Sequence, residues 1–254
     1  MESDKRTSAA VQAAPQEEKQ ANAAAQAAPQ QEKQAAAQAQ AGAQEERRIA
    51  RPKRTFLYTF VVLLYAIVVK ILFFMRIEGR ENIPKERNCV LMGNHQCLLD
   101  PVTLALCVPD REIHFMGKKE LFENRLLGWA FRKVHGFPVD RGNMDMGAIR
   151  TAMNVLKGGE TLGIFPEGTR SKTGYMLPLL SGASMLALRS GCEVIPVYID
   201  GRYRPFHRIT VRVGTAVEMD DLRAGRVTKE SCDALTGRIE ASFYALSGGK
   251  SRAP

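Results

Sequence analysis

Hydrophobic positions are almost absent from the first fifty residues, which consist mostly of Ala, Gln, Glu and Lys. A near-repeat, QAAPQEEKQA at 12–21 and QAAPQQEKQA at 26–35, runs through this segment. No apolar stripe is available for burial, and Pro15 and Pro29 interrupt any helix. Residues 1–50 are therefore predicted to be a low-complexity tether, mainly disordered. An interaction arm is the alternative.

The next pattern is a long apolar run at 56–75, FLYTFVVLLYAIVVKILFFM. Apolar residues would lie on every face of a helix, which disfavours the alternative of an ordinary core helix. Lys70 lies inside the run and basic residues flank both ends, so the charges give no orientation for a single span. We predict that residues 51–76 form a basic cluster followed by a membrane-associated helix, which dips into one leaflet and leaves both ends cytoplasmic.

Beyond residue 76, short apolar runs typical of strands alternate with helical patterns. In the helix expected at 145–157, Met146, Ile149 and Met153 recur at intervals of three and four, and Gly158 ends the pattern. The alternation predicts one α/β domain over 77–250, with its chemistry in the loops at strand ends. Strands are expected near 88–93, 113–117, 134–139, 161–165, 194–199 and 209–213, and helices near 101–108, 119–133, 145–157, 182–190 and 228–246.

Composition narrows the choice of function. The net charge of +9 does not by itself predict nucleic-acid binding. The sequence has no aromatics interleaved with Lys and Arg, no zinc-finger spacing and no clear recognition helix. The basic residues at 47–54 directly precede the apolar run, which suits an anionic membrane surface. Five scattered cysteines without a CxxC pair indicate neither a disulfide framework nor a zinc site, and they fit a reducing cytoplasm. The polar N-terminus does not resemble a cleaved signal peptide.

The stretch NHQCLLDP at 94–101 brings a histidine, a thiol and a carboxylate close together after a predicted strand. Pro101 suits the first turn of the next helix, which puts Asp100 at or near its N-cap. On one continuous helix His95 and Asp100 would lie roughly 140° apart, so their contact requires a turn. If they meet, the carboxylate fixes the imidazole tautomer and leaves the other nitrogen as a general base. Spacing alone leaves this dyad and a helix cap beside a surface histidine equally open.

Further polar residues follow other predicted strands. In FPEGTRS, Gly168 lets the backbone approach a ligand closely, and Thr169 and Arg170 can bind phosphate oxygens. Arg141 follows a strand in the stretch FPVDRG, and Lys118 follows the strand at 113–117. Each residue alone is ordinary, since most Arg and Lys side chains are solvated. Together they place several cations and the His/Asp pair at strand ends of one sheet.

These motifs, in this order, resemble those of the glycerophospholipid acyltransferase family. The matches are Asn94, His95 and Asp100 to its NHx4D motif, Lys118, Glu120 and Leu121 to its KxEL element, FPVDRG to its second motif, FPEGTRS to its third, and Val194-Ile195-Pro196-Val197 to its fourth. The resemblance covers roughly residues 56–215. It departs from the family at Cys97, where serine is common, at Leu180-Ser181, where lysines are common, and at His135, a place often held by glycine.

The resemblance implies a mixed sheet flanked by helices, and acyl transfer from acyl-CoA or acyl carrier protein to the sn-2 hydroxyl of 1-acylglycerol 3-phosphate, giving phosphatidate. His95 would remove the hydroxyl proton, Asp100 would orient His95, and amides near Gly168 would stabilise the oxyanion. No metal or prosthetic group is implied. The enzyme would work at the cytoplasmic face of a membrane. The residues implied to bind substrate are Asn94, Lys118, Arg141, Glu167, Gly168, Thr169 and Arg170.

Three other functions stay open at this point. The acceptor could be another lysophospholipid or glycerol 3-phosphate. A hydrolase could use Cys97 as nucleophile, although no nucleophile-elbow sequence surrounds it and it stands only two residues from His95. A non-enzymatic membrane adaptor would bind lipid without catalytic activity.

Overall fold

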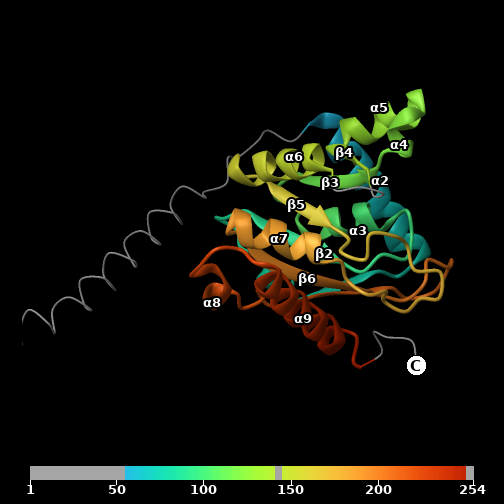
Figure 1. Ribbon diagram of the computed structural model, residues 1–254. Coiled ribbons are helices and arrows are strands. Elements are labelled where there is room, and N and C mark those ends of the chain that lie inside the picture. The colour runs from blue at the N-terminus through green and yellow to red at the C-terminus, as the bar shows by residue number, and fades with distance from the viewer. Residues whose placement is uncertain (1–54, 141–144, 250–254) are drawn as a thin grey trace, which may run out of the picture. The chain divides into compact units, whose positions relative to one another are not determined.

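The computed structural model describes residues 55–140 and 145–249, and both ranges belong to one compact unit of the chain, residues 48–254 (Figure 1). The predicted tether at 1–50 and the basic residues at 51–54 lie outside the described residues. Arg141 of the predicted phosphate-binding group lies outside them as well.

The described residues form one seven-stranded sheet, in the order β1-β7-β6-β2-β5-β3-β4. β6 and β7 pair antiparallel and all other neighbours pair in parallel, so the sheet is mixed, as the resemblance implied. The central strands are buried on both faces, which explains why they appear in the sequence as continuous apolar runs. The strands are β1 (Arg76–Glu78), β2 (Cys89–Gly93), β3 (Ile113–Lys118), β4 (Gly136–Val139), β5 (Thr161–Ile164), β6 (Glu193–Asp200) and β7 (Thr210–Val213).

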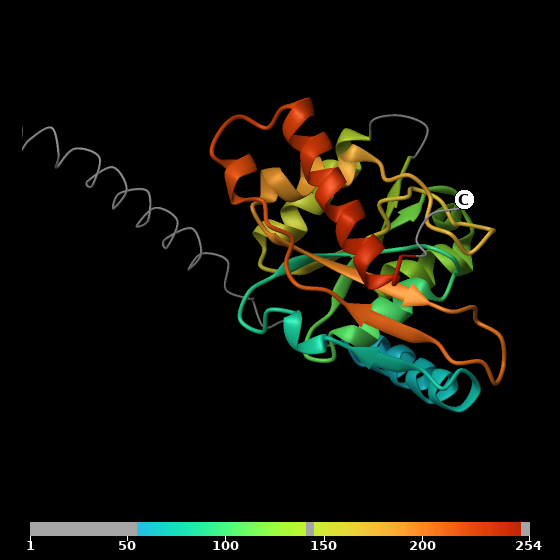
Figure 2. The same cartoon turned by 90° about the horizontal axis from the view of Figure 1, so that it is seen from below.

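Helices cover both faces of this sheet. Figure 2 shows α2 on one side and α9 on the other. Along β2, Leu91 faces the core cluster under α2 and α3, while Val90 and Met92 face the cluster under α6, α7 and α9. This alternation is the period of two expected of a strand, here with both faces apolar. The helices are α2 (Phe56–Leu72), α3 (Asp100–Cys107), α4 (Glu120–Glu123), α5 (Arg125–Lys133), α6 (Met146–Lys157), α7 (Ser181–Ser190), α8 (Asp220–Arg223) and α9 (Lys229–Leu246).

Each predicted strand and helical segment has a counterpart in the structure, within a few residues at its ends. The single helix expected at 119–133 is wrong, because the chain breaks at Asn124 into α4 and α5. Asn124 has an extended backbone, and its side chain accepts hydrogen bonds from the N–H groups of Leu126 and Leu127. Its side chain thus caps a new helix instead of continuing the old one. The short elements β1, α8 and the 3₁₀ turn η1 (Arg80–Asn82) were not predicted, since three or four residues carry no periodic signal.

The apolar run at 56–75 forms the seventeen-residue helix α2. One face is buried through Tyr58, Tyr65 and Val69, which pack on the same side of the sheet as α3. The other face presents large apolar side chains to solvent, namely Phe56, Phe60, Leu63, Leu64, Ile67 and Ile71. Among the described helices, none has both the length and the apolar character that crossing a bilayer requires.

Candidate active site

The sequence motifs meet at the carboxyl ends of three neighbouring strands. His95 follows the end of β2, Glu167 follows the end of β5, and Lys118 is the last residue of β3. β2 pairs directly with β5, with Met92 opposite Ile164, and β5 pairs with β3. Loops at the carboxyl ends of parallel strands are where α/β proteins bind ligands. The sheet order therefore gathers residues that lie more than seventy positions apart in the chain.

His95 and Asp100 are in contact. The Nδ1 atom of His95 lies 2.8 Å from Oδ2 of Asp100, whose side chain is 0% exposed. The same oxygen accepts the backbone N–H groups of Gln96 at 2.6 Å and Cys97 at 2.7 Å. These bonds form the turn that contact between the two side chains requires. Asp100 is the first residue of α3, next to the cap position held by Leu99, and no side-chain hydrogen bond caps this helix. The alternative in which Asp100 only caps the helix is therefore not the one that the structure adopts.

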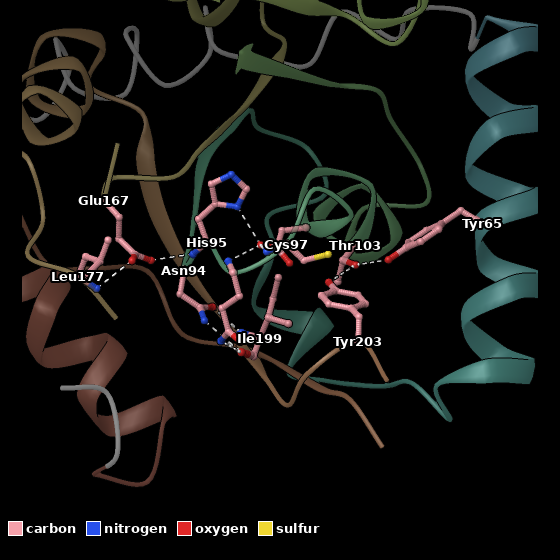
Figure 3. A network of polar contacts seen from close by, with 11 residues as sticks. Tyr65, Asn94, His95, Cys97, Thr103, Glu167, Leu177, Ile199 and Tyr203 are labelled. Atoms are coloured by element: carbon pink, nitrogen blue, oxygen red, sulfur yellow. Dashed lines mark hydrogen bonds and ion pairs between the residues drawn. The ribbon is translucent and has the colours of Figure 1, made fainter. Parts of the chain in front are cut away.

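The orientation of the His95 ring is fixed on two sides, and Figure 3 shows the hydrogen bond on one of them. Its plane stacks on the Phe165 ring, with the centroids 4.2 Å apart and 20° between the planes. Asp100 accepts backbone N–H donors at the oxygen that also faces Nδ1, so Nδ1 carries the proton and donates it to the carboxylate. The lone pair is then on Nε2, for which the described residues provide no hydrogen-bond partner. This is the arrangement in which a histidine can act as a base.

The backbone of His95 is held by the FPEGTRS loop. Its N–H donates to Oε1 of Glu167 at 2.7 Å, and its carbonyl accepts the N–H of Ser171 at 2.8 Å. The second oxygen of Glu167 accepts the N–H of Leu177 at 2.8 Å. Burial raises the pKa of Glu167 to about 7, against the lowering effect of these backbone hydrogen bonds. Glu167, predicted to bind substrate, joins the two loops through its buried carboxylate.

Asn94 is likewise occupied by the protein itself. Its amide accepts the N–H of Ile199 at 2.7 Å and donates to the carbonyl of Ile199 at 3.1 Å, beside the end of β6. The side chain is buried and acts as an additional rung between β2 and β6. Both ends of the amide are thus bonded to Ile199, which gives Asn94 a structural role in this conformation.

Two cavities adjoin the site. An apolar cavity of about 120 Å³ lies between α2 and the α4–α5 segment, and both His95 and Lys118 line it. A larger one, of about 790 Å³, is lined by Glu167, Gly168 and Thr169 together with residues of α6, α7 and α9. The side chains of Met116 and Phe165 contribute to both walls.

The expected phosphate ligands differ in their surroundings. Lys118 is half-exposed and pairs with Glu120 at 2.8 Å, within reach of solvent at the cavity that His95 lines. Thr169 and Arg170 are exposed, directly before the residue whose amide bonds the His95 carbonyl. Within the described residues, no group of three or more His, Cys, Asp or Glu side chains is arranged to hold a metal ion.

Gly168 adopts a left-handed backbone with φ of +68°, and a side chain there would collide with Leu180. This explains why a glycine is needed in the turn. In this conformation the N–H of Gly168 itself donates to the Phe165 carbonyl at 3.1 Å. That amides near Gly168 stabilise an oxyanion stays a prediction.

Cys97 contributes its backbone N–H to Asp100, and no hydrogen bond between its thiol and His95 is found in the described part of the chain. A network that the sequence analysis missed lies on the other side of the dyad (Figure 3). Tyr65 of α2 bonds Thr103 of α3 at 2.7 Å, and Thr103 bonds Tyr203 at 2.8 Å. Tyr203 follows β6 without any motif, so no sequence signal indicated this link.

The sequence of this chain is similar to those of known proteins. Residues 74–200 match the profile of the Acyltransferase family. A Bacillus subtilis protein named 1-acyl-sn-glycerol-3-phosphate acyltransferase is 37% identical over 127 residues, which cover 50% of this chain and 63% of that protein. A Streptococcus pneumoniae protein of the same name is 29% identical over 176 residues, covering 66% and 64% of the two chains. The chain thus spans less than two thirds of the length of these relatives.

The fold also has a solved counterpart. The crystal structure of the 1-acyl-sn-glycerophosphate (LPA) acyltransferase PlsC from Thermotoga maritima superposes with a TM-score of 0.54. At 24% identity, the match covers 79% of this chain and 98% of that chain, and it shows a shared fold. Because the family profile matches half of its 254 residues, this chain belongs to the acyltransferase family.

Proposed function

We propose that this protein transfers an acyl group from acyl-CoA or acyl carrier protein to the sn-2 hydroxyl of 1-acylglycerol 3-phosphate, giving phosphatidate for phospholipid synthesis. The observation that carries the proposal is the buried contact of His95 with Asp100 beside an apolar cavity that has Lys118 at its wall. The names of the Bacillus and Streptococcus relatives support this choice of acceptor.

The dyad performs the chemistry in this proposal. Nε2 of His95 takes the proton of the acceptor hydroxyl as its oxygen attacks the thioester carbonyl. Asp100 holds the imidazole tautomer and stabilises the imidazolium. The new C–O bond forms and the C–S bond breaks, and the imidazolium returns its proton to the departing thiolate. No acyl-enzyme intermediate, metal or prosthetic group takes part.

Cations near the dyad bind the acceptor phosphate. Lys118 lines the cavity of His95, and Arg170 belongs to the loop that holds the His95 backbone, directly before Ser171. A guanidinium binds phosphate through two parallel donors, which fixes the position of the acceptor hydroxyl. We assign Arg141 to the same task on the motif match alone, since it lies outside the described residues.

In this proposal, α2 attaches the protein to the membrane. Residues 51–76 form the anchor, residues 1–50 the tether and residues 77–250 the acyltransferase domain. The exposed apolar face of α2 lies in one leaflet at the cytoplasmic side, where anionic lipids attract the basic residues that precede it. A lipid acceptor can then reach the cavity beside α2 from the bilayer.

The test is acyl transfer by the purified full chain. Radiolabelled acyl-CoA and acyl carrier protein thioester are offered separately with lysophosphatidate, a lysophospholipid of larger headgroup, or glycerol 3-phosphate. Labelled phosphatidate, absent in a His95→Ala control, is the expected product. If transfer occurs only to one of the other acceptors, that acceptor and not lysophosphatidate is the substrate. Lipid binding without any transfer would show an adaptor, and release of free fatty acid alone would show a hydrolase.

A further inference from the structure

Helix α5 exposes an apolar face that the proposed chemistry does not use. Leu126, Trp129 and Ala130 stand three and four residues apart, so they share one side of this helix. Leu126 is 73% exposed and Trp129 is 53% exposed. The opposite side packs on α4, where Gly128 closely approaches the Phe122 backbone. The exposed side therefore contributes nothing to the core of the described domain.

Basic residues stand at both ends of this apolar face. Arg125 begins the helix and Lys133 ends it, while Arg132 lies over the Phe122 ring of α4. The segment 118–133 contains five basic and two acidic residues. Leucine and tryptophan on one face with cations around them are typical of helices that lie in a membrane interface. Tryptophan suits that depth, because its ring is apolar and its N–H can reach water.

The position of α5 points to the same partner. The apolar cavity that His95 lines has α2 residues such as Tyr58 and Val62 on one wall, and Phe131 of α5 on another. Leu98, which is 54% exposed, belongs to the same lining. Figure 1 shows α4 and α5 beside β3 and β4, at the end of the molecule where α2 also lies. The exposed apolar faces of α2 and α5 thus belong to helices on two sides of one cavity.

We infer that α5 is a second membrane-binding element. Leu126, Trp129 and Ala130 insert at the boundary of headgroups and acyl chains, while Arg125 and Lys133 bind anionic headgroups. This inference builds on the proposed membrane-bound reaction and adds an orientation to it. One helix in a leaflet leaves the domain free to rotate about that helix, whereas contacts on two sides of the cavity turn the cavity toward the lipid.

The single tryptophan of the chain makes the inference directly measurable. The full chain is mixed with phosphatidylcholine vesicles that contain or lack phosphatidylglycerol, and Trp129 fluorescence is recorded. We expect a blue shift that is larger with the anionic vesicles, and quenching by lipids brominated on their acyl chains. Trp129 emission that stays unchanged while the protein sediments with the vesicles would overturn the inference, as would a complete lack of vesicle binding.

A charge on the same face provides the second test. Leu126→Glu should weaken binding to the anionic vesicles by about tenfold, since burial of a leucine is lost and a carboxylate meets anionic lipid. The matched control is Tyr244→Glu, at an exposed residue of α9, which packs on the opposite face of the sheet. Equal vesicle binding by Leu126→Glu and the wild type would contradict a role for α5.

Separate readouts keep this inference apart from the proposed reaction. Vesicle binding requires no catalysis, so an inactive chain still tests α5. Transfer to a short-chain, water-soluble acceptor without vesicles should be equal in Leu126→Glu and the wild type, because Leu126 does not line the cavity.

A blue shift that depends on protein concentration alone would mean that a second copy covers α5. A shift with acyl carrier protein but not with vesicles would mean a protein partner. Either result overturns the inference.

Discussion

The Asp100 carboxylate closes the loop after β2 and orients His95 with the same oxygen atom. That oxygen faces Nδ1 of His95 and two backbone N–H groups. An asparagine oxygen could accept the backbone donors, but it carries no charge to stabilise an imidazolium. The loop and the proposed proton transfer therefore respond differently to substitution, which makes the two roles separable.

We expect Asp100→Asn to fold and to lose most of its activity. His95→Ala should lower kcat by about two to four orders of magnitude, the usual effect of removing a general base. Cys97→Ser should retain substantial activity, because only the backbone of Cys97 contacts Asp100. Steady-state kinetics with thermal unfolding as a folding control would decide. A fully active Asp100→Asn protein, or a trapped acyl group on Cys97, would contradict the dyad.

Glu167 is expected to act as a positioning residue whose effect depends on pH. Glutamine has one acceptor oxygen, so in Glu167→Gln its NH₂ must face the N–H of either His95 or Leu177. This variant should lower kcat by displacing the His95 backbone. The folded-state pKa of about 7 is raised above the ordinary value of 4.5, so the folded state binds more protons between these values. The stability that this protonation contributes is present at low pH and is lost as pH rises through about 7.

Denaturant unfolding of wild type and Glu167→Gln at pH 5 and pH 8 would measure this contribution. We expect the stability advantage of the wild type over the variant to be larger at pH 5 than at pH 8. A difference that is the same at both pH values would show that Glu167 does not titrate in this window. Unchanged kcat would show that its link to His95 is not needed for activity.

At the scale of elements, α2 is joined to the site through hydroxyl groups. Tyr65 of α2 reaches Thr103 of α3, which also bonds Tyr203. Burial raises the pKa of Tyr65 to about 12, so its hydroxyl stays protonated at neutral pH. Thr103 lies one turn beyond Asp100 in the same helix, so this network fixes the helix that carries the carboxylate.

Tyr65→Phe removes one hydrogen bond from this network and leaves Thr103 bonded to Tyr203. We expect the free energy of unfolding to fall by about 0.5–1.5 kcal/mol, the usual net value of a buried hydrogen bond. Tyr244→Phe, at an exposed tyrosine of α9, is the matched control and should cause no measurable change. Chemical denaturation of both variants would test this. Equal stability of Tyr65→Phe and the wild type would mean that α2 is held by packing alone.

The elements themselves were largely predictable, because buried strands and amphipathic helices leave strong local patterns. The split at Asn124 was not, since a side-chain cap competes with continued helix over a single residue. The contact of His95 with Asp100 depends on a turn that spacing leaves undetermined. The bond from Glu167 to His95 follows from the pairing of β2 with β5, and local periodicity does not specify strand order. Motif order suggested a shared site; the roles of Asn94 and Glu167 required the fold.

At the scale of the whole molecule, a cluster of histidine and glutamate side chains lies at the amino ends of the strands, whereas the dyad lies at their carboxyl ends. His114 of β3 pairs with Glu160, which precedes β5, and His135, which precedes β4, pairs with Glu112. The two imidazole rings lie 4.7 Å apart. Glu112 also accepts the N–H of Thr55 at the start of α2. The amino ends of β3, β4 and β5 and the start of α2 are therefore connected through two histidine–glutamate pairs.

This cluster should make the stability of the domain sensitive to acid. Burial lowers the pKa of His114 below its ordinary value of 6.5, and the neighbouring His135 adds to this effect, while Glu160 opposes it. The folded state then binds fewer protons than the unfolded chain just below pH 6.5. The contribution of His114 to stability is consequently full above pH 6.5 and is lost as pH falls below it.

His114→Gln keeps a polar partner for Glu160 without a titrating ring, and should flatten this acid-side loss. Unfolding free energies from pH 8 to pH 5 would show the difference, with His207→Gln at an exposed histidine as the control. An acid-side slope that is equal in His114→Gln and the wild type would assign the sensitivity to other groups.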